Sequence, residues 1–460
     1  MSAEAADSAA APTPAVLAES NLTRSVIRLA WPVVIQQVAL TSVQLVDTFL
    51  VGHLGADALA GVGLASILYW VPISGMAAVG IGSTAVVARN VGADRPERAE
   101  VTLRSAQMLA LIWGIAMAVV FFAAAAPMLQ IMGAEPAARD QGVLYMQAAA
   151  LGIPFYSVLF ASTACLQGAG DTRTPMLIML AVNLINGVLS WALINGPGPF
   201  PEYGVQGAGL GYLGAAVAGA LLVVFALRRA GSAVHMAPSR ALSIESAETG
   251  RILRVGVPSG AEQLQFMASF LIYTRIIAGL GTTALAAHQV ALRIEGLTFQ
   301  PGFALGVAAT TLVGQGLGAN RPDLAEKAAT SAGRVAFVFM TAMGVTLMIF
   351  GGPITRLFIN DDEVVDIGRK LLLIFGIALP ALSVSLSLGG ALRGAGDTRS
   401  VLAIMSVGVW GVRLAPAYLL AVVAGLGVPG AWLAAVMDIN TRALLMFLRF
   451  RHGRWKRMKV

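Results

Sequence analysis

The sequence predicts an all-α integral membrane protein with twelve transmembrane helices in two six-helix bundles. Of its 460 residues, 57% are hydrophobic and 12% are charged, and the mean hydropathy is +0.77. Such a chain has too few charges to solvate the surface of a globular protein of this size. Apolar runs of about twenty residues recur about twelve times, each long enough to cross about 30 Å of hydrocarbon as a helix.

An internal duplication divides these runs into two sets. The second half of the chain repeats the first at a constant shift of 226 residues, as from Pro32 to Pro258. The other aligned pairs are Pro154 with Pro380, VGADRPERAE (91–100) with LGANRPDLAE (317–326), and LQGAGDTRTP (166–175) with LRGAGDTRSV (392–401). Two apolar halves in tandem are typical of secondary transporters, whose substrate path lies between the repeats.

The duplication predicts the order of domains. We expect a cytoplasmic tail over residues 1–25, a first lobe over 26–228, a cytoplasmic linker over 229–253, a second lobe over 254–450 and a basic cytoplasmic tail over 451–460. Each lobe has six spans. The first twenty residues carry no Lys or Arg and no apolar core, so they are neither a secretory signal nor a transit peptide.

The basic residues predict the topology. Lys and Arg concentrate on alternate loops and in the carboxyl-terminal tail, with Arg139, Arg356, Arg369 and Lys370 as the main exceptions. The positive-inside rule therefore places both termini in the cytoplasm, with an even number of spans in each lobe. The two repeats then share one orientation and are related by a pseudo-twofold axis along the membrane normal.

Several other classes of protein are disfavoured. The single cysteine, Cys165, cannot form an internal disulfide. The net charge of +7 has no basic stripe interleaved with aromatic residues, so we expect no nucleic-acid partner. No phosphate-binding GxxxxGK[ST] loop, HExxH helix or paired aspartate motif is present. We expect no enzyme activity and no cofactor.

The chain resembles the multidrug and toxic compound extrusion (MATE) family from about Ser25 to Lys456. The similarity rests on VDTFLVGHLG (46–55), ALAAHQVALRIEGLTFQPG (284–302), the two GAGDTR loops and the closing RFRHGRW (449–455). The resemblance implies a V-shaped arrangement of two lobes that exports organic cations or amphiphilic compounds in exchange for sodium ions or protons. It also implies a multi-pass protein of a prokaryotic inner membrane, which we expect to be a monomer.

Asp47 is the first candidate site residue. It lies deep in the first apolar run, where an unpaired charge is costly, and its repeat counterpart is Tyr273. The duplication has therefore not kept a carboxylate at this position for architecture. Desolvation favours the neutral acid unless a sodium ion neutralises it, and the family places its cation or proton site here. The alternative role is a hydrogen bond between helices.

The residues expected around Asp47 match the family only in part. The resemblance implies a polar pair four residues apart on the fifth helix and a Thr on the sixth. Asn183 fits the first of the pair, but the second falls on Gly187, with Asn186 one residue earlier, and Tyr212 stands near the Thr position. A proton needs only the carboxylate, so we favour protons over sodium as the coupling ion. Carbonyl groups and waters would have to complete a sodium site.

The second lobe carries further polar side chains within its apolar runs. In the family, acidic residues serve this lobe at positions that fall here on Phe266 and Leu382. Glu262 precedes Phe266 by one helical turn and is a candidate for a displaced acidic site. The candidate residues for the substrate cavity or for a second polar site are Gln36, Gln37, Glu262, Gln263, His288, Gln289 and Glu295.

Opposite charges at comparable depth suggest internal ion pairs. Arg293 and Arg413 are the bases, and Glu295 and Asp438 are the acids. Pairing makes their burial tolerable, although a carboxylate that exchanged Arg for a proton or a substrate would be a switch. His288 titrates near neutral pH in other settings, but we interpret it as a hydrogen-bonded packing residue.

The GAGDTR loops are interpreted as structural. Their Gly residues supply turn conformations, Asp and Thr cap the next helix, and Arg anchors the cytoplasmic side. The sequence thus predicts a multidrug antiporter that works by alternating access. Three rivals are a lipid or lipid-linked oligosaccharide flippase of the same superfamily, a membrane-embedded transferase or hydrolase, and a channel.

Overall fold

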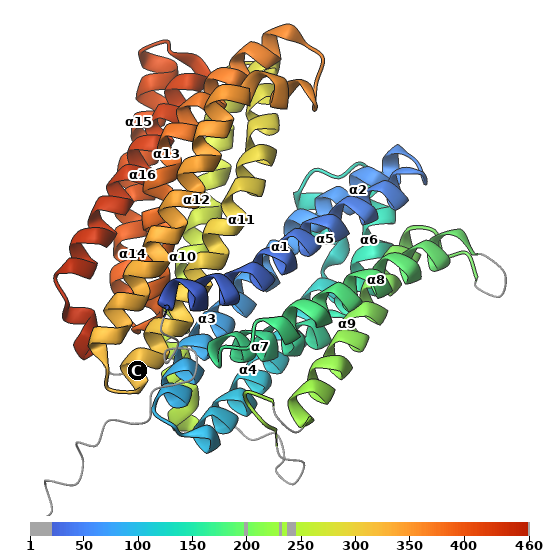
Figure 1. Ribbon diagram of the computed structural model, residues 1–460. Helices are drawn as coiled ribbons and strands as arrows, with labels where there is room; N and C mark the ends of the chain where they lie inside the picture. Colours follow the sequence, from blue (N-terminus) through green and yellow to red (C-terminus); the bar gives the residue numbers. More distant parts are fainter. Residues whose placement is uncertain (1–20, 197–200, 230–231, 237–244, 459–460) are drawn as a thin grey trace, which may run out of the picture. The chain divides into compact units, whose positions relative to one another are not determined.

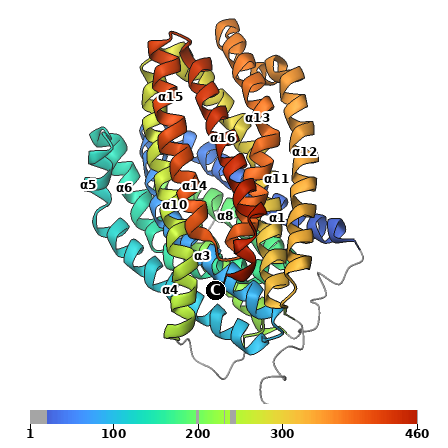
Figure 2. The same ribbon diagram turned by 90° about the vertical axis from the view of Figure 1, so that its left-hand side faces the viewer.

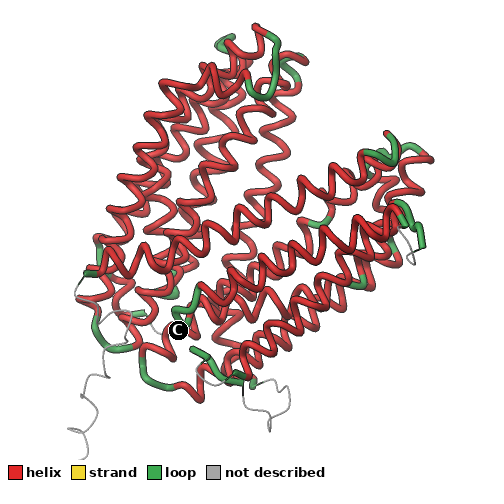
Figure 3. Tube along the Cα trace, turned by 45° about the vertical axis from the view of Figure 1, so that its right-hand side comes forward, coloured by secondary structure: helices red, strands yellow, loops and turns green. Residues whose placement is uncertain are grey.

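The structure is a computed structural model that describes residues 21–196, 201–229, 232–236 and 245–458, without the side chains of residues 43–45. These residues form helices joined by loops, and no strand occurs among them (Figures 1 and 3). The amino-terminal half contains α1 (Leu22–Gly52), α2 (Ala56–Leu68), α3 (Trp70–Gly92), α4 (Pro96–Ala123), α5 (Ala125–Ile131), α6 (Pro136–Ala150), α7 (Ile153–Gly168), α8 (Arg173–Asn195) and α9 (Val205–Arg228).

The carboxyl-terminal half repeats this order with fewer breaks. It contains α10 (Ser246–Ala278), α11 (Thr282–Gly318), α12 (Pro322–Arg356), α13 (Asp362–Gly394), α14 (Thr398–Ser406), the π-helix η1 (Val407–Leu414), α15 (Ala415–Tyr418), the π-helix η2 (Leu419–Val423), α16 (Gly427–Arg451) and the 3₁₀-helix η3 (Arg454–Arg457). The predicted boundaries of the linker and the tail therefore shift. Helix α10 begins within the expected linker, and residues 237–244 lie outside the described residues.

The duplication extends to the backbone. Helices α2 and α3 together cover the range that α11 covers 226 residues later, and α6 and α7 match α13 in the same way. Asp94 and Asn320, which are aligned in the repeat, both adopt left-handed backbone angles, with φ of 55° and 56°. Asn and Asp tolerate this conformation better than other residues with a side chain. The two halves are thus copies of one helical plan.

The span count comes close to the predicted twelve. Within the described part of the chain, ten helical segments are long and apolar enough to cross a membrane, or eleven when α6 and α7, bent by 52°, count as one span. Helix α10 takes the place of α1 in the second repeat, but its polar side chains lower its hydropathy. The bend precedes Pro154, whereas α13 continues through Pro380. The matched prolines therefore do not produce matched bends.

Packing divides the described chain into two units that differ from the predicted lobes at two places. The C-unit contains the residues up to Val34, the loop 91–94 and the residues from Val257, and the N-unit contains 35–90 and 95–256. The first turns of α1 thus belong to the C-unit, and the first turns of α10 belong to the N-unit. Each division falls within a few residues of the proline of that helix, Pro32 or Pro258.

Small residues let the helices of each unit approach closely. In the C-unit, α11, α12 and α13 pack through buried alanines, and Figure 2 shows α14 and α15 beside α16. The hydroxyl of Thr310 donates to the carbonyl of Gly390 at 2.8 Å, and in the N-unit its counterpart Thr84 donates to the carbonyl of Ala164 at 2.9 Å. These bonds hold the second and fourth spans of each half together. They give the site a rigid scaffold.

Candidate functional site

Asp47 lies one and a half turns before the end of α1 and is partly buried. Its Oδ1 atom is buried and accepts no hydrogen bond from the residues that the structure describes. An unpartnered buried oxygen of an ionised carboxylate is costly, because it has lost its water without gaining a donor. The position therefore calls for a proton or a cation.

Helix α8 carries Asn183 and Asn186 and contacts α1 next to Asp47. It meets α1 where Val46 lies against Gly187, since a Cβ built on this glycine would lie 3.8 Å from the Val46 side chain. Asn183 lies one turn before Gly187 on the same face. The Nδ2 atom of Asn183 and the Oδ1 atom of Asn186 are buried, and neither has a hydrogen-bond partner among the described residues. The contact of Val46 with Gly187 thus brings together the segments of α1 and α8 that carry Asp47, Asn183 and Asn186, and the joint role of these three residues stays a prediction.

A cluster of tyrosines, which sequence reasoning missed, lies on the other side of Asp47. Tyr145 of α6 is close enough to Asp47 to interact with it electrostatically. The ring of Tyr69 lies 6.3 Å from that of Tyr145 and 6.1 Å from that of Tyr212, and Tyr212 lies 5.9 Å from Tyr156. Tyr212, predicted to stand at the Thr position of the sixth helix, belongs to this cluster. The tyrosines supply an apolar wall with hydroxyl groups.

The second half has charged side chains at the positions that correspond to part of this tyrosine cluster. The repeat counterparts of Asp47, Tyr69, Gly187 and Tyr212 are Tyr273, Glu295, Arg413 and Asp438. The predicted pair of Arg413 and Asp438 is present, with Nε donating to Oδ2 at 2.8 Å, and both side chains are buried. Arg413 also lies over the rings of Phe266 and Tyr273 at 5.6 and 5.9 Å from their centroids.

Sequence reasoning missed the third member of this ion cluster. Arg442 lies one turn after Asp438 on α16. Its Nη2 atom donates to Oδ2 at 2.7 Å, and its Nε atom forms an ion pair with Oδ1 at 2.7 Å. The spacing of four residues was the available signal. Glu295 lies within electrostatic reach of Arg413 and Arg442, so the cluster contains two acids and two bases. The π-helix η1 changes the direction of the side chains along the helix and points Arg413 toward Asp438.

Arg293 does not join this cluster. Its side chain is exposed, and no ion pair with Arg293 occurs among the described residues. The prediction of an internal ion pair at Arg293 was wrong, because the helix turns its side chain away from the bundle core while its neighbour Ile294 is buried in that core. Gln263 and Gln289 are exposed as well, and Gln37 is partly buried.

Glu262 is part of an ion pair rather than an open acidic site. It is buried, and Arg393 donates to both of its carboxylate oxygens, one of them at 3.4 Å. The aligned positions in the first half are Gln36 and Gln167, which share a hydrogen bond of 3.1 Å. Arg393, which directly precedes the second GAGDTR loop, thus links α13 to α10. This bridge joins the first and fourth spans in both halves.

The packing interpretation of His288 agrees with the structure. His288 is buried, and the indole Nε1 of Trp432 donates to its Nδ1 at 3.2 Å. The two GAGDTR loops differ from each other. Asp171 caps α8 through the amides of Arg173 and Thr174, as predicted. Asp397 makes no such cap to α14, because its carboxylate pairs with Arg449 at 2.7 Å.

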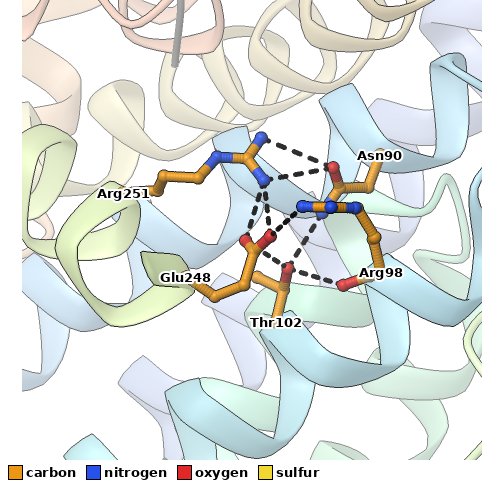
Figure 4. Close-up of polar contacts among 5 residues, drawn as sticks. All are labelled: Asn90, Arg98, Thr102, Glu248 and Arg251. Carbon is orange, nitrogen blue, oxygen red and sulfur yellow. Dashed lines mark hydrogen bonds and ion pairs between the residues drawn. The ribbon is translucent and has the colours of Figure 1, made fainter. Parts of the chain in front are cut away.

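A buried carboxylate that sequence reasoning did not single out fixes the start of α10 (Figure 4). Glu248 is 1% exposed and accepts hydrogen bonds from Arg251 at 2.7 and 2.8 Å, from Arg98 at 3.4 Å and from Thr102 at 3.2 Å. Thr102 also accepts from the amide of Asn90 at 2.9 Å. The first turn of α10 is thus held on α3 and α4 inside the N-unit.

Comparison with known proteins agrees with the resemblance. The MatE family model matches residues 32–192 and 258–419. A probable multidrug resistance protein NorM of Thermotoga maritima is 28% identical over 96% of this chain and 94% of its own length. A NorM relative from Geobacillus kaustophilus is 30% identical over 94% of this chain and 95% of its own length.

The fold matches solved structures over its full length. A MOP superfamily transporter from Pyrococcus furiosus superposes with a TM-score of 0.88 at 24% identity, and the match covers 97% of this chain and all of that one. A structure described as MATE in the straight conformation has the same TM-score and identity. The fold is therefore that of the known MATE structures. From the family model and the relatives together, the chain belongs to the MatE family of membrane transporters.

Proposed function

We propose that this protein is a secondary active multidrug exporter that exchanges amphiphilic compounds, organic cations among them, for a cation bound at Asp47. The relatives named multidrug resistance protein NorM, MdtK and PmpM support export of drugs. Since these relatives are bacterial, we place the protein in a prokaryotic inner membrane, with both termini in the cytoplasm as the charges predict.

One observation carries this proposal. Three buried polar atoms without partners among the described residues lie on Asp47, Asn183 and Asn186, at one helix junction of the N-unit. Leaving each atom unpaired costs about 1–3 kcal/mol. A proton or a small cation bound to the Asp47 carboxylate relieves this cost at its Oδ1 atom, whereas the Nδ2 atom of Asn183 is a donor and needs an acceptor. The Oδ1 atom of Asp438 also lacks a hydrogen bond from the described residues, but the charge of that carboxylate is balanced by ion pairs with two arginines.

The residues favour a proton over sodium. A sodium ion needs several oxygen ligands, and here Asp47 and the amide oxygens of the two asparagines are the side chains in position to supply them. A proton needs only the Asp47 carboxylate. Protonated Asp47 can also donate to an amide oxygen, which satisfies both groups in an apolar setting.

Coupling follows from a difference in affinity between conformations. A ligand shifts an equilibrium only as far as it binds one state better than the other. The charged form of Asp47 favours the conformation that exposes this side chain to water. The protonated form favours the conformation that buries it. If substrate binds best to the conformation in which Asp47 has no bound ion, substrate and coupling ion exclude each other. Export of one substrate is then coupled to the import of one ion.

Transport by purified protein in liposomes tests this proposal. Efflux of a fluorescent drug is driven separately by a pH gradient and by a sodium gradient, for the wild type, for Asp47→Asn and for Asp57→Asn. Asp57 is a matched control, because it is an exposed carboxylate at the start of α2. We expect Asp47→Asn to lose gradient-driven efflux and Asp57→Asn to keep it.

The same assay separates the rival functions. Undiminished efflux by Asp47→Asn overturns the proposed site, and efflux with sodium alone replaces the proton by sodium. Ionic current without exchange would indicate a channel. Movement of a labelled lipid between leaflets, in place of drug efflux, would indicate a flippase.

A further inference from the structure

A polar face runs along α11 on the side away from the bundle core. Gln289, Arg293, Gly296 and Gln300 follow one another at spacings of four, three and four residues, which places them on one side of the helix. The first three are exposed, and a Cβ built on Gly296 would meet nothing within 4 Å. We call these four residues the α11 polar face.

Arg293 lies inside α11, a helix long and apolar enough to cross a membrane. It is two residues from Glu295, which is within electrostatic reach of Arg413 and Arg442. Those arginines bind Asp438, which lies near the middle of α16. Arg293 is also about 16 Å along the axis from the first residue of α11. Charged side chains inside membrane-spanning segments face the bundle interior or a water-filled space. Because the Arg293 side chain is exposed rather than buried in the bundle, this rule predicts that it faces water.

Among the residues that the structure describes, no carboxylate forms an ion pair with Arg293. The residues three and four positions away on α11 are Gln289, Val290, Gly296 and Leu297, none of which is acidic. Elsewhere in the C-unit, Glu262 is bound by Arg393, and Asp438 by two arginines. The α11 polar face therefore presents an unbalanced positive charge to water.

We infer that the α11 polar face binds the anionic group of an amphiphilic substrate, a carboxylate, sulfonate or phosphate. A guanidinium binds such groups through two parallel hydrogen bonds, and the amide of Gln289 lies one turn away as a further donor. Leu297 and Phe303, 53% and 38% exposed, continue the same side of the helix as an apolar surface. This inference rests on the proposed function and narrows its substrate class from organic cations to amphiphiles that carry an anionic group.

Two dyes with one aromatic core and different charge test this inference. Sulforhodamine B carries sulfonates, and tetramethylrhodamine methyl ester is a cation. Fluorescence anisotropy measures the binding of each dye to purified protein, for the wild type, Arg293→Gln, Arg293→Glu and Arg275→Gln. Arg275 is the matched control, an exposed arginine one turn before the end of α10. Binding is measured without a gradient, so the result does not depend on ion coupling at Asp47.

We expect the wild type and Arg275→Gln to bind the sulfonated dye more tightly than the cationic one. Arg293→Gln should weaken binding of the sulfonated dye by about tenfold or more with little change for the cation, and Arg293→Glu should reverse the preference. Equal affinities of the wild type and Arg293→Gln for sulforhodamine B would overturn the inference, as would a wild-type preference for the cation.

If phosphatidylglycerol added to the protein displaces the dye, the anionic group belongs to a lipid. If it does not, the group belongs to a soluble amphiphile.

Discussion

At the scale of single residues, the two halves treat buried charge in opposite ways. The Asp47 carboxylate keeps one oxygen without a partner among the described residues. The Asp438 carboxylate, at the position of Tyr212 in the first half, is bound by Arg413 and Arg442. The charge of the Asp438 carboxylate is thus balanced by two guanidinium groups. We therefore propose that ion exchange takes place in the half that contains Asp47.

Substitution of Asp438 tests the structural role of the ion cluster. Asp438→Asn would leave Arg413 and Arg442 buried without their counter-charge, so we expect a loss of about 3–5 kcal/mol of stability. Thermal unfolding of the purified protein measures this loss. Replacing the four residues of the cluster together by Glu295→Gln, Arg413→Met, Asp438→Leu and Arg442→Met should restore most of the stability. An Asp438→Asn protein as stable as the wild type would contradict this role.

Some of these residues could be predicted from sequence and others could not. Asp47 was identified because a charge inside an apolar run is costly and because the repeat does not conserve it. The pair of Arg413 and Asp438 was identified by the same argument. The tyrosine cluster was missed because aromatic residues are common in membrane helices. Arg293 was misassigned because the direction of a side chain depends on how its helix packs, which charge and depth do not determine.

At the scale of secondary structure, α1 and α10 each contribute several turns to both units. The first turns of α10 are held in the N-unit by Glu248, and the rest of the helix from Val257 belongs to the C-unit. Leu22, the repeat counterpart of Glu248, carries no charge. The attachment of α10 by an ion network is therefore specific to the second repeat.

Substitution of Glu248 tests this attachment. Glu248→Gln removes the charge that Arg251 and Arg98 share, so we expect a loss of about 1–3 kcal/mol of stability. The measurement is thermal unfolding of the purified protein, with Asp323→Asn as control. Asp323 forms an exposed pair with Arg321, and such pairs contribute about 0–1 kcal/mol. Equal effects of the two substitutions would show that the network does not hold α10.

The start of α10 shows why some elements escape prediction. Residues 246–253 contain Glu248 and Arg251 and do not form an apolar run, so the sequence assigned them to a linker. Their charges are satisfied by side chains far away in the chain, which composition does not reveal. The other helices were predicted because the apolar runs and the exact repeat of their loops place their ends.

At the scale of the whole molecule, the two halves share one backbone plan but differ in their buried polar residues. The aligned helix boundaries and the matched left-handed residues show that both halves keep one backbone plan. Their buried polar residues differ, with a carboxylate and tyrosines in one half and paired ions in the other. We expect the first half to carry the coupling ion and the second half to contribute substrate selectivity through the face that contains Arg293.

The most direct test of this account measures protons when substrate binds. Sulforhodamine B is added to purified protein in weakly buffered, sodium-free solution. The change in pH is recorded for the wild type and for Asp47→Asn. Because substrate and proton exclude each other in the proposed cycle, their binding is linked reciprocally, and the wild type should release protons whereas Asp47→Asn should release none. Equal release by both proteins, or none by a wild type that binds the dye, would contradict the assignment of Asp47 as the coupling site.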